Sequence, residues 1–211
     1  MVCGIDEAGR GCLCGSLFMC GVLGSEQDLQ DLGIKDSKKL TQKQRQTIAK
    51  NLHKLANNGI ISYFLTQKSA TQIDALGLSV CLKQSLEEIV TFFNTRQNAQ
   101  PKHTQQSTTQ NHLHAYTFLY DGNTSFGLKV SPPHNLKTLI KGDCKNLLIG
   151  AASILAKVAK DTEMLRLHSL YPQYHLKNNK GYGTKAHIQA ILDFGYTQEH
   201  RKSFHITQRL L

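Results

Sequence analysis

The sequence predicts an α/β domain built on a mixed β-sheet. Short apolar runs at residues 2–6, 17–23 and 60–66 are typical of strands, and further strands are expected to end at Asp121 and Asp143. The early strands follow one another closely, whereas the later ones alternate with long helical segments, an order typical of mixed sheets. At 211 residues the chain is long enough to bury a substantial core, and we expect residues 1–211 to form one catalytic domain.

Two helices are expected in the first half of the chain. Thr41 and Gln44 have the spacing of a capping box, which begins a helix over residues 42–56. A longer helix is expected over about 74–96, because apolar residues recur there at helical spacing. These residues are Leu78, Leu82, Leu86, Ile89 and Phe93. Residues 97–114 are polar and aperiodic, which predicts an inserted surface loop; its histidines could bind a metal, but a solvated loop explains them better.

The second half is expected to be mainly helical. A segment rich in alanine and leucine predicts a helix from about Asn146 to Leu170. Thr184 is a suitable N-cap for a last helix, and Gly195 is a suitable stop for it.

The charge balance favours a nucleic-acid partner. Twenty-five Lys and Arg residues stand against fifteen Asp and Glu, giving a formal net charge of +10. Such an excess favours a polyanionic partner, although an ordinary basic protein would have the same balance.

Cysteine spacing and hydropathy indicate the compartment. The six cysteines include no C-x-x-C pair, so reduced thiols are expected rather than a disulfide framework or a zinc site. No apolar run approaches the roughly 18 residues of a membrane span. Asp6, Glu7 and Arg10 would interrupt the apolar core of a signal peptide. We therefore expect a soluble, cytoplasmic monomer without membrane contact.

Carboxylates stand where the predicted strands end, at Asp6 with Glu7, at Asp121 and at Asp143. In open sheets, ligands gather at strand ends, so these acids can converge on one spot. Each acid has an ordinary alternative: Asp121 could belong to a turn, Asp143 could cap a helix, and the adjacent pair could edge a loop. Neighbouring strand residues point to opposite faces, so Asp6 and Glu7 can share a site only if the strand ends or bulges, which Gly9 would allow.

The acids as a set predict metal-dependent chemistry. Three or four clustered carboxylates repel one another unless a cation compensates them. Oxygen ligands select Mg²⁺ or Mn²⁺, and such ions stabilise the attacking and leaving oxygens of a phosphoryl displacement. The sequence has no G-x-x-x-x-G-K-[ST] loop, G-x-S-x-G elbow or H-E-x-x-H motif. A metal-dependent nuclease is the chemistry that follows.

Two segments of the first half could contact a nucleic acid. The stretch Gly9, Arg10, Gly11 offers backbone groups to a sugar or phosphate, although glycines beside a hairpin are usually only turn residues. The segment “KDSKKL” offers Lys38 and Lys39 to phosphates, with a solvated loop as the alternative.

Two further segments lie near the C-terminus. Tyr182 stands between glycines and close to Lys180, so its ring could stack on a sugar or base beside a phosphate-binding cation. The segment “HRKSF” (200–204) adds another basic cluster. Asp161 follows Lys157 by four residues, and a helical ion pair explains it better than catalysis.

Motifs along the whole chain occur in the order and approximate spacing of a known family. They are “GIDEAGRG”, “DSKKLT”, “YDGN”, “KGDCKNLLIGAASILAKVAKD”, “YPQYHLKNNKGYGT” and “HRKSF”. From residue 4 to about residue 206 the chain resembles the type 2 ribonucleases H (ribonuclease HII), particularly the bacterial form. The resemblance implies an RNase H-like fold, with helices flanking the sheet and a helical, substrate-binding part at about 171–211.

The resemblance also implies an activity. The expected enzyme is an endonuclease that uses Mn²⁺ or Mg²⁺ to cut the RNA strand of RNA–DNA hybrids. It is also expected to incise 5′ of single ribonucleotides in duplex DNA, leaving 3′-hydroxyl and 5′-phosphate ends. Its partners would be RNA–DNA hybrid and ribonucleotide-containing duplex DNA.

Motif positions carry the family's roles onto this sequence. The implied catalytic acids are Asp6, Glu7, Asp121 and Asp143. The implied metal ligands are Asp6, Glu7 and Asp121. The implied substrate-binding residues are Gly9, Arg10, Gly11, Ser37, Lys38, Lys180 and Tyr182. The glycine-arginine-glycine loop would read the 2′-hydroxyl, the group that distinguishes RNA from DNA at one position, and the tyrosine would stack on the next deoxyribose.

The chain departs from the family's pattern after the “GRG” motif, and two alternative functions stay open. Where the family commonly has a proline after “GRG”, this chain has “CLCGS”, which could alter the turn and expose Cys12 or Cys14 to oxidation. A non-catalytic module that binds RNA–DNA hybrids is one alternative, against which the intact acids argue. An enzyme acting on DNA alone is the other, against which the “GRG” loop argues.

Overall fold

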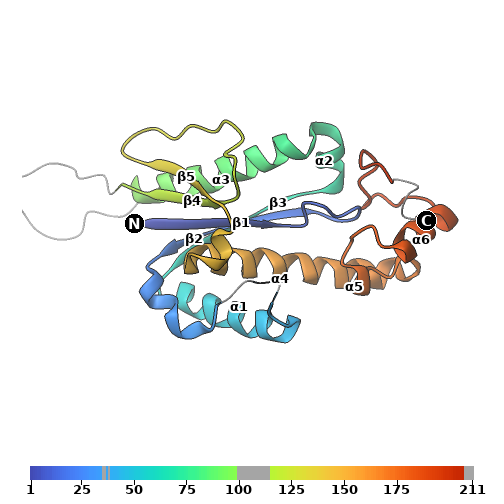
Figure 1. Cartoon of the computed structure of the whole chain (residues 1–211), viewed down its shortest axis with the longest axis horizontal. Helices are drawn as coiled ribbons and strands as arrows, with labels where there is room; N and C mark the ends of the chain where they lie inside the picture. Colours follow the sequence, from blue (N-terminus) through green and yellow to red (C-terminus); the bar gives the residue numbers. More distant parts are fainter. Residues whose placement is uncertain (35–36, 38, 99–114, 207–211) are drawn as a thin grey trace, which may run out of the picture.

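The chain folds around a five-stranded mixed sheet with helices on both faces (Figure 1). The computed structural model describes residues 1–34, 37, 39–98 and 115–206. The strands are β1 (Val2–Ala8), β2 (Leu17–Gly24), β3 (Ser62–Lys68), β4 (Thr117–Asp121) and β5 (Asn135–Leu139). The α-helices are α1 (Gln42–Asn57), α2 (Ala70–Leu76), α3 (Leu78–Asn98), α4 (Leu147–Leu170), α5 (Leu176–Asn179) and α6 (Lys185–Phe194). Short 3₁₀ turns are η1 (Glu26–Leu32), η2 (Gly142–Cys144) and η3 (Pro172–Tyr174).

The strand order is β3-β2-β1-β4-β5, and the sheet is mixed as predicted. The first three strands pair antiparallel, whereas β4 is parallel to β1 and β5 is parallel to β4. The parallel pairing matters for function, because it brings the carboxyl ends of β1 and β4 to the same edge of the sheet.

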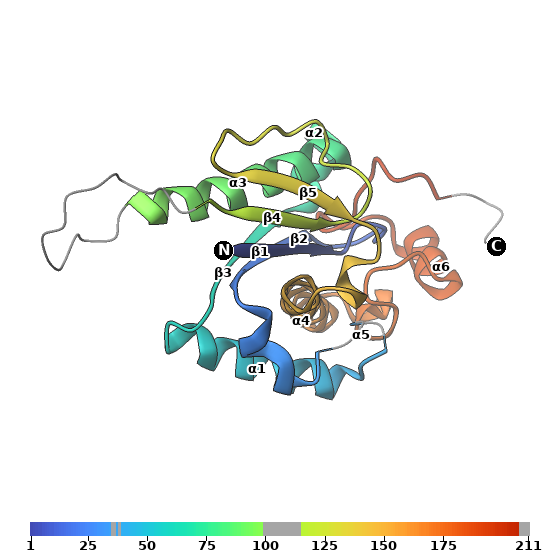
Figure 2. The ribbon, with the colours of Figure 1, turned by 60° about the vertical axis from the view of Figure 1, so that its left-hand side comes forward.

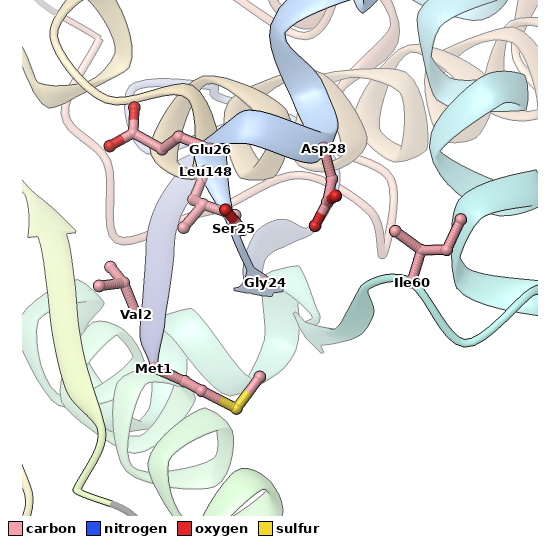
Figure 3. A pocket seen from close by; sticks show the side chains of 8 residues that line it. All are labelled: Met1, Val2, Gly24, Ser25, Glu26, Asp28, Ile60 and Leu148. Carbon is pink, nitrogen blue, oxygen red and sulfur yellow. The ribbon is translucent and has the colours of Figure 1, made fainter.

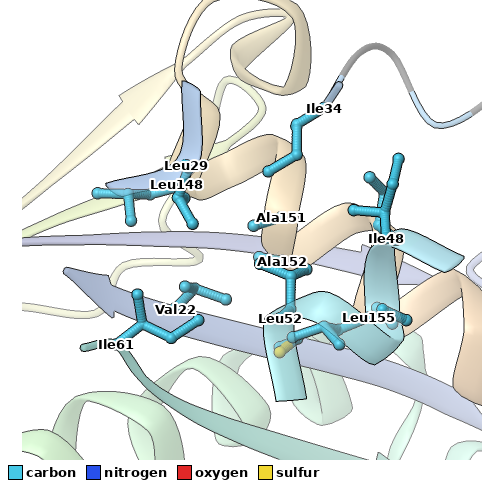
Figure 4. Close-up of a cluster of buried hydrophobic side chains, with 14 of the residues drawn as sticks. Val22, Leu29, Ile34, Ile48, Leu52, Ile61, Leu148, Ala151, Ala152 and Leu155 are labelled. Atoms are coloured by element: carbon cyan, nitrogen blue, oxygen red, sulfur yellow. The ribbon is translucent and has the colours of Figure 1, made fainter. Parts of the chain in front are cut away.

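Each face of the sheet carries its own core. Helices α1 and α4 cover one face, and α3 covers the other (Figure 2). The α4-side core joins α1, β2 and α4 through residues such as Leu52, Val22 and Leu155 (Figure 4). The other core joins β1, α3 and β4 through residues such as Ile5 and Phe93. With both faces covered, the sheet is a rigid platform for side chains at its ends.

Helix α4 runs directly across β1 at Gly4. A Cβ atom at this position would lie 2.3 Å from the backbone nitrogen of Ile149 and 2.3 Å from the carbonyl carbon of Leu148. Only a residue without a side chain allows the two backbones to approach so closely. Gly4 therefore fixes where α4 crosses the strand, two residues before Asp6.

The helix caps expected from the sequence are present. The Thr41 and Gln44 side chains form a capping box at α1, and Thr184 accepts a hydrogen bond from the His187 N–H at the start of α6. Gly195 ends α6. Asn146 caps α4, within one residue of the expected start.

The helix expected over 74–96 is wrong at its N-terminal end. Ser69 and Gln72 form a capping box that begins the separate helix α2, and Gly77, at φ +82°, ends it. Because Gly77 has left-handed φ, the chain turns before α3 begins at Leu78. The loop expected at 97–114 falls on residues 99–114, outside the described part, while 97–98 complete α3.

The segment after α4 packs as a small helical layer against the end of the molecule. Its η3, α5 and α6 share a third core, in which Tyr174, Leu176 and Ile191 pack against Met164 and Leu167 of α4. Within the described residues, no helix combines the length and apolarity that a membrane crossing would need.

Candidate active site

Asp6 and Asp121 lie on the same face and at the same end of neighbouring strands. Ile5 of β1 pairs with Tyr120 of β4, and both side chains belong to the core on the α3 side. The next residue of each strand points to the α4 side, because side chains alternate along a strand. Carboxylate oxygens of Asp6, Asp121 and Asp143 all lie within 4.8 Å of one another.

Asp143 belongs to a different element from the one that the sequence predicted. It was expected at the end of a strand, but β5 ends at Leu139 and Asp143 lies in the 3₁₀ turn η2. The turn is tied to the site because the Gly142 N–H donates to Asp121 Oδ1 over 2.8 Å. Asp143 is not the cap of α4 either, since that role belongs to Asn146.

Glu7 projects from the opposite side of β1. The strand end or bulge that would let Asp6 and Glu7 share one site is absent there, because β1 pairs regularly with β2 as far as Ala8. Glu7 Oε2 accepts a hydrogen bond from the Tyr120 hydroxyl at 2.7 Å, and Glu7 Oε1 lies 3.6 Å from Nη1 of Arg10. It therefore lies beside the group of Asp6, Asp121 and Asp143 rather than within it.

Burial and mutual repulsion make this cluster unfavourable as bare carboxylates. Burial raises the pKa of Asp6 well above its usual range, and the charges of Glu7 and Asp121 raise it further. A side-chain hydrogen bond with Ser153 and a 2.7 Å bond from the Glu7 N–H to Asp6 Oδ1 act in the opposite direction. Burial also raises the pKa of Glu7. A divalent cation would relieve the repulsion, and all-oxygen ligation is what Mg²⁺ and Mn²⁺ prefer. The residues present therefore fit such an ion.

Ser153 of α4 connects the cluster to the segment before α1. Its hydroxyl is hydrogen-bonded to Asp6 and lies 2.9 Å from the hydroxyl of Ser37, which is buried. The Ser37 carbonyl accepts from Nη1 of Arg45 at 3.0 Å. Lys38, expected to bind substrate, lies outside the described residues. Sequence analysis missed Ser153, and its only signal was a lone hydroxyl in an otherwise apolar helical stretch.

The glycine-rich loop of residues 9–16, which we name the GRG loop, lies directly beside Tyr182. A Cβ atom added at Gly11 would meet a ring carbon of Tyr182 at 3.9 Å. The N–H groups of Leu13 and Cys14 both donate to the Gly181 carbonyl, at 2.8 and 3.2 Å. Two segments from opposite ends of the chain thus form one surface, on which the Arg10 side chain is 56% exposed and Tyr182 is 47% exposed.

Lys180 lies behind this surface. Its backbone has a left-handed φ of 55°, and its Nζ donates to Oε1 of Gln42 at 3.4 Å. Burial lowers the pKa of the Lys180 ammonium. The two cysteines of “CLCGS” are fully buried, which corrects the expectation that they could be exposed to oxidation. Burial also raises the pKa of Cys12, whose thiol donates to the Lys180 carbonyl.

The surroundings of Asp161 and of the segment 200–204 differ from what the sequence suggested. Asp161 pairs with Lys157 over 2.9 Å, as expected, but it also pairs with Arg45 over 3.0 Å. In “HRKSF”, His200 and Arg201 are buried, so this segment is not a continuous basic surface. The sequence could not show whether this segment is buried or exposed, because the burial of Arg201 depends on its packing against residues 10–15.

A pocket on the α4 side lies far from the acids. It measures about 430 Å³ and lies at the start of β1 (Figure 3). Asp6 and the acids around it lie toward the end of that strand. The lining of the pocket includes Val2, Gly24, Glu26 and Asp28. Acidic side chains there would repel a polyanion, so this pocket is unfavourable for a nucleic acid.

A family model described as Ribonuclease HII matches residues 3–207. The chain belongs to the ribonuclease HII family. Ribonuclease HII of Helicobacter pylori (strain HPAG1) is 45% identical over 214 residues, spanning 100% of this chain and 94% of that protein. Ribonuclease HII of Campylobacter concisus (strain 13826) is 41% identical, spanning 99% and 95%.

Solved structures agree with this membership. The ribonuclease HII in a PCNA complex from Archaeoglobus fulgidus superposes with a TM-score of 0.72 at 25% identity, covering 99% of this chain and 96% of that one. A ribonuclease HIII, Bst-RNase HIII in complex with Mn²⁺, gives 0.68 at 18% identity, covering 96% and 66%, and it supports the fold alone. The fold is RNase H-like, and ribonuclease HII chains are metal-dependent endonucleases of the ribonuclease H class that act on RNA–DNA hybrids.

Proposed function

We propose that this chain cuts the RNA strand of RNA–DNA hybrids and incises 5′ of single ribonucleotides embedded in duplex DNA. The observation that carries the proposal is the position of the GRG loop and Tyr182 at the same end of the sheet as the converging acids. One group can hydrolyse a phosphodiester while the other senses the 2′-hydroxyl beside it.

The catalytic acids in this proposal are Asp6, Glu7, Asp121 and Asp143. The proposed metal ligands are Asp6, Glu7 and Asp121. Asp6 and Asp121 belong to the group whose oxygens lie within 4.8 Å of one another, Glu7 lies beside that group, and Asp143, which belongs to it, is close enough to contribute an oxygen. A bound Mn²⁺ or Mg²⁺ would stabilise negative charge on the attacking and leaving oxygens. The carboxylates orient the attacking water and accept its proton. The water oxygen bonds to phosphorus, the bond from phosphorus to the 3′ oxygen breaks, and that oxygen takes up a proton. The products are 3′-hydroxyl and 5′-phosphate ends.

Recognition would come from the surface shared by the GRG loop and Tyr182. Backbone groups of Gly9, Arg10 and Gly11 can hydrogen-bond a 2′-hydroxyl without reading a base, so cutting would not depend on sequence. The half-exposed Tyr182 ring can stack on the adjacent deoxyribose. The remaining proposed contacts are Ser37, Lys38 and Lys180. The part from about 171 to 211 would then be the substrate-binding portion of a single catalytic domain.

Two of these three residues lie in the described part of the chain. Ser37 lies near the acids, and Lys180 lies next to the GRG loop. Ser37 is buried and reaches the acids through Ser153, so we propose that it contacts substrate through its backbone. Lys180 joins the GRG loop through its backbone carbonyl, which accepts from the Cys12 thiol, and its ammonium would contact a phosphate of the substrate. We further propose that the protein acts as a cytoplasmic monomer.

Nicking of a DNA duplex with one ribonucleotide tests the proposal. We expect cleavage 5′ of the ribonucleotide with Mn²⁺ or Mg²⁺, none with EDTA, and none of the matched all-DNA duplex. Asp6→Asn should still bind the duplex but not cut it. Nicking without metal would contradict the mechanism, equal cutting of all-DNA duplex would contradict the specificity, and binding without turnover under either metal would favour the non-catalytic alternative.

A further inference from the structure

The GRG loop has little capacity to hold its own shape. Glycines at positions 9, 11 and 15 give its backbone wide freedom, and residues 9–16 contain no proline. Gly9 and Gly15 have left-handed φ values of 92° and 81°. Contacts from other segments must therefore define the conformation, since a loop of this composition would otherwise lose much of its order.

Arg201 supplies such contacts to both ends of the loop. Its Nη1 donates to the Arg10 carbonyl at 3.1 Å, and its Nε donates to the Gly15 carbonyl at 3.0 Å. Its backbone N–H donates to the Leu13 carbonyl at 2.8 Å. A single residue, 186 positions away from Gly15, thus binds three carbonyls of one loop.

Burial of the Arg201 side chain carries a free-energy cost. The Arg201 side chain is fully buried, and among the described residues no carboxylate forms an ion pair with it. Its Nη2 is buried with no hydrogen-bond partner among them. Burying a guanidinium that has the Phe204 ring, 5.2 Å away, but no carboxylate as its partner, together with an unsatisfied N–H group, opposes folding. Among the described residues, the hydrogen bonds of this side chain go only to carbonyls of the GRG loop.

Peptide geometry shows what the contact to Arg10 achieves. A trans peptide is planar, and its C=O and N–H point in opposite directions. When Arg201 draws the Arg10 carbonyl inward, the N–H of Gly11, in the same peptide plane, must point away from Arg201. Gly11 is the loop residue that borders Tyr182. The N–H of Gly11 is thereby directed to the surface on which a 2′-hydroxyl would be sensed.

We infer that Arg201 is a positioning residue for ribonucleotide recognition, which orients the Gly11 amide by holding the Arg10 and Gly15 carbonyls. The inference rests on the proposed role of the GRG loop. Arg201 contacts no substrate in this scheme, and it differs in this from the exposed Arg10 side chain.

The test compares binding of two duplexes that differ in one hydroxyl. Asp6→Asn protein, which should not cleave, is titrated with a DNA duplex carrying one ribonucleotide and with the identical all-DNA duplex, by fluorescence anisotropy. The measured quantity is the ratio of the two dissociation constants. This ratio does not depend on the folded fraction, because unfolded protein weakens both apparent affinities equally.

In the same background, Arg201→Gln should lower the preference for the ribonucleotide by about fivefold or more, the effect of one lost hydrogen bond. Arg201→Lys should lower it less, because an ammonium keeps the charge but cannot reach both carbonyls at once. The matched control is Asp74→Asn. Asp74 accepts from the N–H groups of Lys202 and Ser203, so it anchors the same segment without contacting the loop, and its variant should keep the full preference.

An unchanged ratio in both Arg201 variants would overturn the inference, even if both affinities fell. A reduced ratio in Asp74→Asn equal to that of Arg201→Gln would overturn it too, because it would assign the effect to general docking of the segment. A ratio of one in the parent protein would instead refute 2′-hydroxyl recognition itself, and the inference with it.

Discussion

Protonation of the buried pair His187 and His200 should destabilise the protein in mild acid. His200 Nδ1 accepts from the Thr197 N–H at 3.0 Å, so the proton of the neutral ring is on Nε2. That Nε2 lies 3.1 Å from Nε2 of His187, whose Nδ1 lies 2.8 Å from the Tyr182 carbonyl and must donate to it. The chain of hydrogen bonds is complete only when both rings are neutral, because a second proton would set two N–H groups against each other.

The pKa of His200 gives the size of the effect. Burial, and then the charge of His187, lower this pKa to about 4 from an ordinary value of 6.5. The unfolded state therefore binds a proton more readily than the folded state. Stability from this group is complete above pH 6.5, falls as the pH drops toward 4, and is constant below that. The difference of 2.5 in pKa corresponds to about 3 kcal/mol.

Urea unfolding in EDTA between pH 4 and pH 7.5 measures this contribution. The comparison is between the wild type and His200→Asn, in which the amide oxygen can replace Nδ1 as acceptor for Thr197. Carboxylates titrate in both proteins and cancel from the difference. The advantage of the wild type at pH 7 should shrink by about 3 kcal/mol at pH 4. His53→Asn, at an exposed position, should show no such trend. A difference that stays constant with pH would refute the reasoning.

Three further substitutions separate metal binding, recognition and stability. Ser153→Ala removes the hydroxyl bonded to Asp6, and the Mn²⁺ concentration for half-maximal nicking should rise about tenfold at unchanged circular dichroism; an unchanged Mn²⁺ dependence would exclude this role. Tyr182→Ala should raise KM for ribonucleotide-bearing duplex about tenfold and leave urea unfolding unchanged, whereas equal KM values would remove the ring from recognition. Lys160→Met leaves the buried Glu163 without its 3.0 Å ion pair and should cost about 3–5 kcal/mol in urea unfolding; a loss below about 1 kcal/mol would contradict it.

Local signals in the sequence predicted local structure well. Capping at Thr41 and Thr184 and the stop at Gly195 were confirmed, because each depends on hydrogen bonds within a few residues. Family resemblance, carried by several motifs in order, correctly indicated the fold. The class of enzyme followed from the same motifs.

Features that depend on distant contacts were predicted less well. Asp143 was expected on a strand, but the 3₁₀ turn that contains it is fixed by a hydrogen bond to Asp121, 21 residues from its donor. The basic segment at 200–204 could not be recognised as partly buried, because its neighbours come from the other end of the chain. Ser153 was missed for the same reason, since its partners are brought near by folding.

Helix α4 also sets a fixed distance between the support of the acids and the support of the GRG loop. Ser153 supports the acids, and Lys160, seven residues later, donates to the Cys14 carbonyl of the GRG loop at 3.0 Å. Seven residues are about two turns, or roughly 10 Å along one side of the helix. An insertion or deletion between them would rotate one support away by about 100° per residue. During divergence of such enzymes, α4 should therefore tolerate substitutions but not changes of length, and new substrate preferences should arise in the loops that the helix supports.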